Sequence, residues 1–212
     1  MEREKEVNEV LDALRNCDFG ELIECVFWEK IVGPFKERYK KPFTYEAGAT
    51  KGVLMFKDLG FVIKIPFVGD DNDYFYGSGY SDGWNYCQTE EKRFEFAKEY
   101  GLDQCFLELK YIGHIDNYPI YLQEYISEVG GGIHYASYSD KERNEMTDRC
   151  EGSGYNCFNP NWLLDAFKYY GEEIFYKLLR FIDDYDIDDL HGANLGYQNG
   201  KPLIIDYASF NN

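Results

Sequence analysis

The sequence has no long apolar run, no excess of positive charge and few histidines. No apolar stretch approaches the roughly 18 residues that a membrane-spanning helix requires, and the charged N-terminal segment MEREKEVNEVLDALRN lacks the apolar core of a secretory signal. Lys and Arg number 22 against 39 Asp and Glu, whereas nucleic-acid binding needs clustered cations. We therefore expect a cytoplasmic protein that has neither a membrane nor a nucleic acid as its partner.

The chain also lacks C-x-x-C pairs and histidine clusters. Six cysteines are scattered along it with only three histidines, so a zinc site is not expected. Free thiols in a reducing compartment fit this pattern. Cys150 and Cys157 flank the glycine-rich segment EGSGYN and could still pair with each other.

Apolar, aromatic and acidic residues are abundant instead. Hydrophobic residues make up 44% of the sequence and aromatic residues 18%, which suits a globular core and argues against disorder. A length of 212 residues fits one substantial core or two small lobes. The net charge of −17 suits a cationic small molecule or a basic protein as partner, or it serves solubility alone.

Residue spacing in the first 126 positions predicts antiparallel strands together with three helices. Short β-branched and aromatic runs between glycines and turn residues predict antiparallel strands within 42–67 and 109–126. The Gly/Asp/Tyr-rich segment 69–86 has no periodicity and forms an insert. Apolar residues at helical spacing predict helices over 7–14, 21–32 and 87–100.

The remaining residues predict a mostly helical unit. One short helix is expected over 140–147, within an irregular segment that contains GGG and GSG. From 161 to 185, apolar residues recur every four positions with further apolar residues beside them, which predicts a long core helix. Strands before helices indicate an α+β protein in two lobes. The expected divisions are a helical segment 1–41, an N-lobe 42–126 and a C-lobe 127–212.

Three polar residues with a notable spacing follow the long helix. Asn194 comes five residues after Asp189, and Asp206 comes twelve residues after Asn194. The hairpin dipeptide Asn199–Gly200 lies between Asn194 and Asp206, so a two-stranded ribbon would bring these two side chains together. Carboxylate and amide oxygens so placed suit Mg²⁺, which also takes waters and the phosphates of a substrate.

The run Asp189-Leu-His-Gly-Ala-Asn194, followed by Ile-Ile-Asp206, resembles the catalytic loop and metal-binding strand of the protein-kinase-like superfamily. It is nearest the aminoglycoside-phosphotransferase and choline-kinase branch, whose loop reads D-x-H-x-x-N, whereas protein kinases place a lysine where His191 stands. The resemblance implies a bilobal fold with a small antiparallel-sheet N-lobe and a reduced, mostly helical C-lobe. It also implies ATP- and Mg²⁺-dependent phosphotransfer to a hydroxyl of a small-molecule or protein acceptor.

The N-terminal half offers further parts of such a kinase in the expected order. The resemblance places a turn containing Gly48, Ala49, Thr50 and Gly52 against the phosphates, although the full G-x-G-x-x-G spacing is missing. Lys64 in FVIKIPF would contact the α- and β-phosphates. Taken alone, this lysine could equally lie on an edge strand with its amine in solvent.

The helix over 87–100 and the strand after it supply the remaining N-lobe parts. Glu90 and Glu91 are both available to fix Lys64, and Glu90 is favoured because it shares a face with apolar residues. Gln123 would guard the back of the adenine pocket. The Glu124 carbonyl and the Ile126 amide would meet the adenine edge.

The resemblance also assigns roles in the C-lobe. Asp189 would orient the attacking hydroxyl and accept its proton, while Asn194 and Asp206 would hold Mg²⁺. His191 would mainly support the loop. Ile187 occupies the position of the first residue of the family's H-x-D motif, so one contact that stabilises the loop is missing.

Other readings stay open. The chain ends six residues after Asp206, so it resembles compact, C-terminally shortened kinase-like proteins of bacteria or bacteriophages. A nucleotide-binding pseudokinase that regulates other proteins, or a kinase fold that transfers AMP, would share the same motifs. The acceptor is unidentified. The N-terminal helices could cap the small lobe or pair two copies of the chain.

Overall fold

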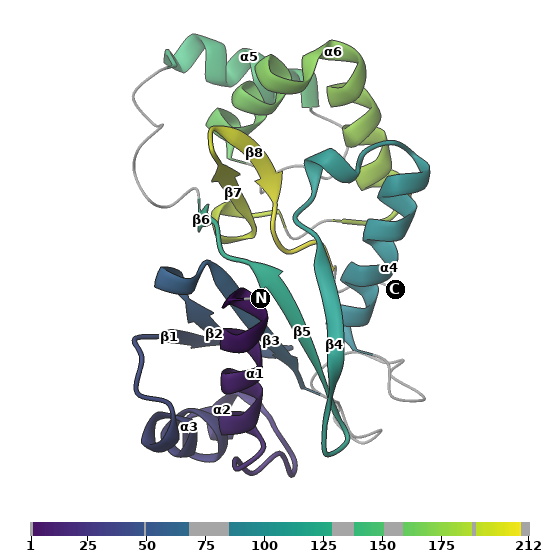
Figure 1. Ribbon diagram of the computed structural model, residues 1–212. Helices are drawn as coiled ribbons and strands as arrows, with labels where there is room; N and C mark the ends of the chain where they lie inside the picture. Colours follow the sequence, from purple (N-terminus) through teal and green to yellow (C-terminus); the bar gives the residue numbers. More distant parts are fainter. Residues whose placement is uncertain are drawn as a thin grey trace. The chain divides into compact units, whose positions relative to one another are not determined.

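The computed structural model describes residues 2–48, 50–67, 85–128, 138–150, 159–187 and 190–208 (Figure 1). The chain is an α+β protein, as the sequence predicts, and forms two compact units. These are Met1–Thr89 with Leu109–Tyr125, and Glu90–Glu108 with Ile126–Asn212. The predictions for Ala49, Cys157 and Asp189, and for most of the segment 69–86, lie outside the described residues.

The first unit is built on a five-stranded antiparallel sheet with the strand order β1-β2-β3-β5-β4. The strands are β1 (Thr44–Ala47), β2 (Lys51–Phe56), β3 (Phe61–Pro66), β4 (Leu109–Ile115) and β5 (Tyr118–Glu124). Asp116 has a φ of 52° in the short turn between β4 and β5, a conformation that aspartate tolerates. The predicted antiparallel strands are confirmed.

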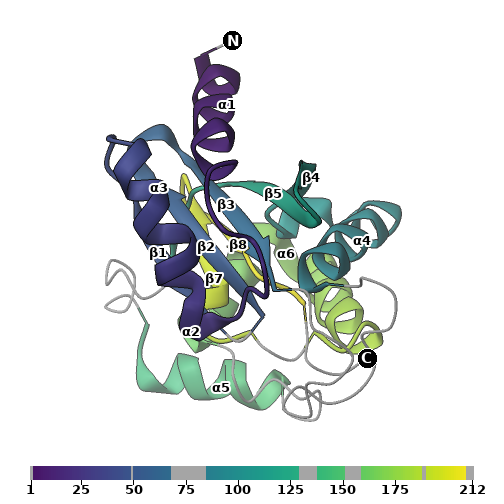
Figure 2. The same cartoon turned by 90° about the horizontal axis from the view of Figure 1, so that it is seen from below.

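Helices cover one face of this sheet, and Figure 2 shows α2 and α3 lying across it. The helical elements are α1 (Glu2–Leu14), α2 (Glu24–Phe27), the π-helical turn η1 (Trp28–Val32), α3 (Gly33–Arg38) and the 3-10 turn η2 (Lys57–Leu59). Val10 and Leu14 of α1 are buried in the same core as Phe56 and Ile63 of the sheet. The α1 helix therefore caps the sheet of its own unit.

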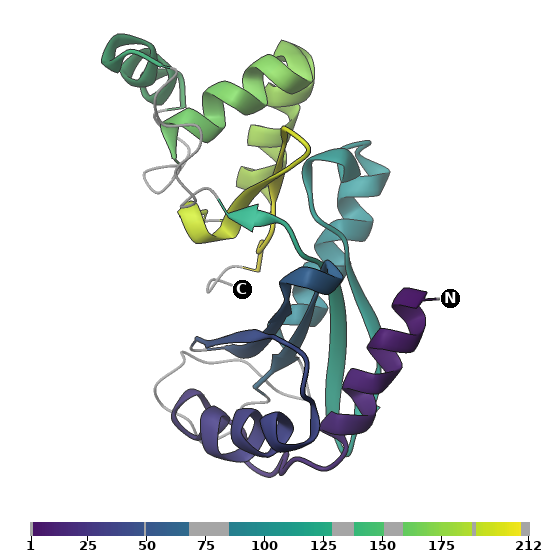
Figure 3. The ribbon, with the colours of Figure 1, turned by 60° about the vertical axis from the view of Figure 1, so that its left-hand side comes forward.

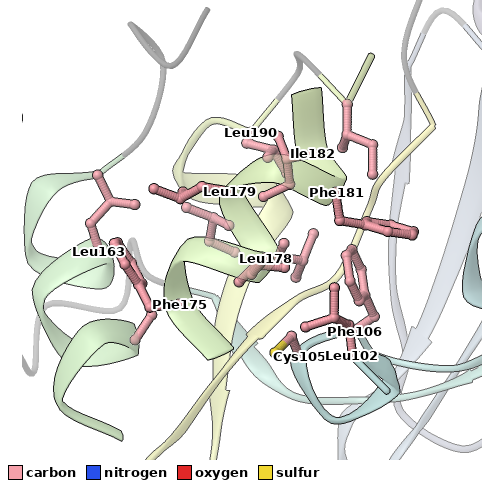
Figure 4. Packing of buried hydrophobic residues seen from close by; sticks show 14 of the residues in the cluster. Leu102, Cys105, Phe106, Leu163, Phe175, Leu178, Leu179, Phe181, Ile182 and Leu190 are labelled. Atoms are coloured by element: carbon pink, nitrogen blue, oxygen red, sulfur yellow. The ribbon is translucent and has the colours of Figure 1, made fainter. Parts of the chain in front are cut away.

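The second unit combines a three-stranded sheet, β6-β7-β8, with helices. Its elements are the larger part of α4 (Tyr86–Glu99), η3 (Asp103–Cys105), β6 (Ser127–Glu128), α5 (Asp140–Cys150), α6 (Pro160–Asp184), η5 (Gly192–Asn194), β7 (Leu195–Gln198) and β8 (Lys201–Ile204). Figure 4 shows Leu178 and Phe181 of α6 close to Cys105 and Phe106 in its core. Segment 90–108, which the sequence assigned to the N-lobe, belongs here because its apolar residues join this core.

The α6 helix is bent where the sequence predicts one continuous helix. Gly171 has φ 78° and ψ 167° inside it, a backbone conformation that is essentially restricted to glycine. Figure 3 shows α6, in light green, as two segments that meet at an angle. The apolar stripe continues on both sides of the break, with Trp162 and Leu178 fully buried. The prediction of a core helix is confirmed, and its continuity was wrong.

The predicted short helix is α5, which extends three residues beyond its expected end to Cys150. Ser139 Oγ accepts a hydrogen bond from Glu142 N (3.3 Å), and Glu142 Oε2 accepts one from Ser139 N (2.8 Å). This reciprocal pair is a capping box, which satisfies amide groups that the first helical turn leaves unbonded. Among the described residues, no helix combines the length and the apolar character needed to cross a bilayer.

Candidate functional site

The β7–β8 hairpin of the second unit forms the predicted ribbon (Figure 1). Leu195 pairs with Ile204 at its open end, and Asn199 and Gly200 form the turn with φ values of 52° and 81°. A two-residue hairpin turn with two positive φ angles favours an Asn-Gly pair. Local backbone preference therefore sets the register that brings the two ends of the ribbon together.

Asn194 and Asp206 meet at the open end of this hairpin. The Asn194 carbonyl accepts a hydrogen bond from Ile205 N at 2.8 Å and one from Asp206 N at 3.4 Å. Both candidate metal ligands are half-buried. The structure thus brings together the two residues that the sequence proposes as Mg²⁺ ligands, and we call this arrangement the Asn194–Asp206 corner.

His191 braces the same corner. It precedes η5, and its Nδ1 accepts a hydrogen bond from Ala193 N at 3.2 Å. Its Nε2 lies 3.4 Å from Asn194 Nδ2, while its carbonyl accepts a hydrogen bond from Asn194 N at 2.9 Å. Both ring nitrogens therefore face the turn that carries Asn194, which fits a supporting role for His191.

An apolar cluster adjoins the corner. Ile126 is buried with Leu107 and Leu203, and Ile205 packs against these three side chains. Ile205 directly precedes Asp206, so the residue proposed to meet adenine lies near the proposed metal ligand within the second unit. Ile205 is the half-buried member of this cluster, and an apolar side chain of this kind suits the face of a planar base.

The α6 helix ends directly before the predicted catalytic loop. Asp186 has a φ of 48° there, and Ile187 N donates a hydrogen bond back to the Ile182 carbonyl at 2.9 Å. This bond spanning five residues is the pattern of a Schellman C-terminus, where glycine is the usual residue with positive φ. Ile187 is buried in the core of the second unit.

Arg93 is a residue of this region that the sequence analysis missed. Its Nη1 donates a hydrogen bond to the Tyr207 carbonyl and its Nη2 donates one to the Tyr185 carbonyl, each at 2.6 Å. The Tyr207 hydroxyl in turn donates to the Leu107 carbonyl at 3.0 Å. The only sequence signal for Arg93 was its position three residues after Glu90, which places both residues on the inner face of α4.

The glycine-containing turn of the first unit connects β1 and β2. Gly48 N donates a hydrogen bond to the Lys51 carbonyl at 3.0 Å, and Phe67 N donates one to the Thr50 carbonyl at 2.8 Å. Gly52 lies within β2 rather than in the turn, and a Cβ atom there would lie only 2.1 Å from the Phe27 ring. Close packing against Phe27 thus explains why position 52 holds a glycine, which the sequence alone does not reveal.

Lys64 lies in β3, an inner strand of the sheet, and only 3% of its surface is exposed. The alternative of an edge-strand lysine with its amine in solvent is therefore wrong. Lys64 pairs with Val53 on β2, so Lys51, two residues before Val53, shares its face. Diagonal neighbours of this kind are about 7–8 Å apart, within reach of long side chains. Lys51 is 8% exposed and is a second candidate phosphate ligand.

The remaining predicted residues take distinct environments. Glu90 has no exposed surface whereas Glu91 is half-buried, which fits the choice of Glu90 for the inner face of α4. Gln123 is buried in β5 and Glu124 is exposed at its end. Because Lys64 and Glu90 belong to different units, their pairing stays a prediction.

The donor chemistry of the Asn194–Asp206 corner fits Mg²⁺. Within the described residues, no three His, Cys, Asp or Glu side chains gather as a metal site. Asn194 and Asp206 offer one amide and one carboxylate group, and Mg²⁺ commonly takes one or two protein oxygens together with water and substrate phosphates. A site built around a nucleotide is therefore compatible with these residues.

Comparison with protein-family models and with curated proteins finds no match for this chain. The resemblance to the protein-kinase-like superfamily therefore rests on the spacing of the residues themselves.

Proposed function

We propose that this chain is an ATP- and Mg²⁺-dependent phosphotransferase with a bilobal protein-kinase-like fold, acting on a hydroxyl of a small-molecule or protein acceptor. The main support is the Asn194–Asp206 corner, where a backbone hydrogen bond joins the two candidate ligands and His191 braces Asn194. The order of the other motif residues along the chain adds to this support. The net charge of −17 favours a cationic acceptor.

Each residue then has a role in phosphoryl transfer. Asp189 would orient the acceptor hydroxyl and take its proton, while Asn194 and Asp206 would hold Mg²⁺. Bound Mg²⁺ would offset the negative charge that spreads over the phosphate oxygens. Because phosphoryl transfer needs little covalent chemistry from the protein, alignment by these side chains supplies most of the effect.

The first unit would bind the rest of the nucleotide. Lys64 and Lys51 share one face of the sheet and offer two ammonium groups for the phosphates. We further propose that Glu90 pairs with Lys64, that the Gly48–Thr50 turn contacts the phosphates, and that the Glu124 carbonyl and Ile126 amide meet adenine.

Turnover of ATP carrying radioactive phosphorus in either the α or the γ position tests this proposal. We expect γ-label to appear on an acceptor or as inorganic phosphate, and α-label to stay in ADP. Asp206→Asn should lower this turnover about 100-fold or more. Asp184→Asn is a matched control, because Asp184 is exposed at the end of α6.

The same experiment separates the alternatives. Covalent transfer of α-label to protein would mean AMP transfer and would contradict the proposal. Bound ATP without release of either label would indicate a pseudokinase. Equal loss of turnover in Asp206→Asn and Asp184→Asn would remove Asp206 from the reaction.

A further inference from the structure

Arg93 connects α4 to the chain on both sides of the hairpin that carries the Asn194–Asp206 corner. Its guanidinium donates to the Tyr185 carbonyl, at the end of α6, and to the Tyr207 carbonyl, one residue after Asp206. Only 6% of its surface is exposed. A buried charge of this kind is stable only where hydrogen bonds replace its hydration.

The geometry suits an arginine better than a lysine. A guanidinium is planar, permanently charged and able to donate to two acceptors at once, whereas the lysine ammonium is a compact point charge. The Tyr185 carbonyl also lies at the C-terminal end of α6, where the helix dipole favours a cation. Ile187 is buried in the core of the second unit, and its side chain has no hydrogen-bond donor that could take the place of Arg93.

The backbone is thereby held on both sides of Asp206, at its own amide and at the carbonyl of Tyr207. Its amide donates to the Asn194 carbonyl at 3.4 Å, and the carbonyl of the next residue accepts from Arg93 at 2.6 Å. The Tyr207 side chain is itself fixed, since it is fully buried and its hydroxyl donates to the Leu107 carbonyl. These contacts restrict the backbone on either side of Asp206, and with it the direction in which its side chain leaves the chain.

We propose that Arg93 is a positioning residue that sets the geometry of the Asn194–Asp206 corner from α4. The role in metal binding rests on the proposed function. The positioning itself does not, because it concerns only contacts within the second unit.

Amide hydrogen exchange, followed by NMR on the full chain, tests the positioning without any nucleotide. In Arg93→Lys and Arg93→Met, exchange at Ile205 N and Asp206 N should accelerate at least tenfold beyond any uniform change. The control is Tyr170→Phe, which removes a hydroxyl that donates to the Gln104 carbonyl at 3.0 Å and to the Pro202 carbonyl in β8, nearer the turn of the hairpin than the corner. In this control, exchange at Ile205 N and Asp206 N should change no more than exchange at other amides of the second unit. Unaltered exchange at both amides in the two Arg93 variants would overturn the proposal.

Calorimetric titration of ATP, with and without Mg²⁺, tests the link to metal binding. We expect Arg93→Lys to reduce the Mg²⁺-dependent gain in ATP affinity about tenfold while leaving metal-free ATP affinity unchanged. Tyr170→Phe should retain the gain. A wild-type chain without such a gain would refute the proposed function, and the exchange result would still decide whether Arg93 positions the corner. An intact gain in Arg93→Lys would overturn its role in metal binding.

Discussion

A methyl group at position 52 would collide with the ring of Phe27. The Cβ of an alanine there would lie 2.1 Å from Phe27 Cε2 and 2.2 Å from Cζ, whereas ordinary contact begins at 3.4 Å. The ring would have to retreat by more than about 1 Å from a fully buried position beside Phe67. Overpacking costs about 1–3 kcal/mol, and expelling a buried phenylalanine costs a similar amount. We therefore expect Gly52→Ala to destabilise the first unit by about 3 kcal/mol.

Thermal unfolding followed by circular dichroism measures this effect. For a chain of this size, about 3 kcal/mol corresponds to a midpoint lowered by roughly 6–12 °C. Gly48→Ala is the control, because a Cβ at Gly48 meets no atom within 4 Å, and it should change stability by less than about 0.5 kcal/mol. Adding Phe27→Leu to Gly52→Ala should restore part of the loss.

The outcome also separates packing from nucleotide binding. An unchanged midpoint in Gly52→Ala would refute the packing argument. If the midpoint stayed unchanged while ATP affinity fell, Gly52 would serve the nucleotide and not the Phe27 contact.

Three further predictions concern α6 and the core of the second unit. Gly171→Ala should cost about 1–3 kcal/mol, because φ 78° and ψ 167° strain any other residue; an unchanged thermal midpoint would contradict the bend. Asp186→Gly should add up to about 1 kcal/mol, since Asp186 has a positive φ, and a lowered midpoint would count against this. Burial raises the pKa of Cys105 from 9.0 to about 12. Above pH 9 the unfolded chain therefore releases a proton that the folded chain keeps, and the free energy of unfolding falls by about 1 kcal/mol between pH 9 and 10. In denaturant titrations Cys105→Ala should reduce this slope, and an equal slope would exclude Cys105 as its source.

Features set by neighbouring residues were predictable from the sequence. The turn at Asn199–Gly200 follows from backbone preferences of two residues, and the ribbon that joins Asn194 to Asp206 follows from that turn. The antiparallel strands follow from their composition and from the glycines between them. The apolar stripe placed α6 in a core, because burial depends on side-chain spacing rather than on helix continuity.

Features set by distant contacts were not predictable in this way. The four-residue stripe of α6 runs on through Gly171, so the pattern hides the bend. Arg93 meets carbonyl groups that come later in the chain, and backbone acceptors leave no mark in a sequence. Lys51 became a candidate only when the strand register placed it on the face of Lys64. The sequence places Gly52 in a phosphate-binding turn. It does not show that the Phe27 ring, from another segment, packs against position 52.

The most direct test of the central claim is calorimetric titration of ATP into wild-type protein and Asp206→Asn, each with and without Mg²⁺. The claim predicts that Mg²⁺ strengthens ATP binding to the wild type and that this gain is lost in Asp206→Asn. An equal gain in both proteins would show that Asp206 does not hold the metal. The absence of ATP binding to the wild type under both conditions would contradict the proposed function as a whole.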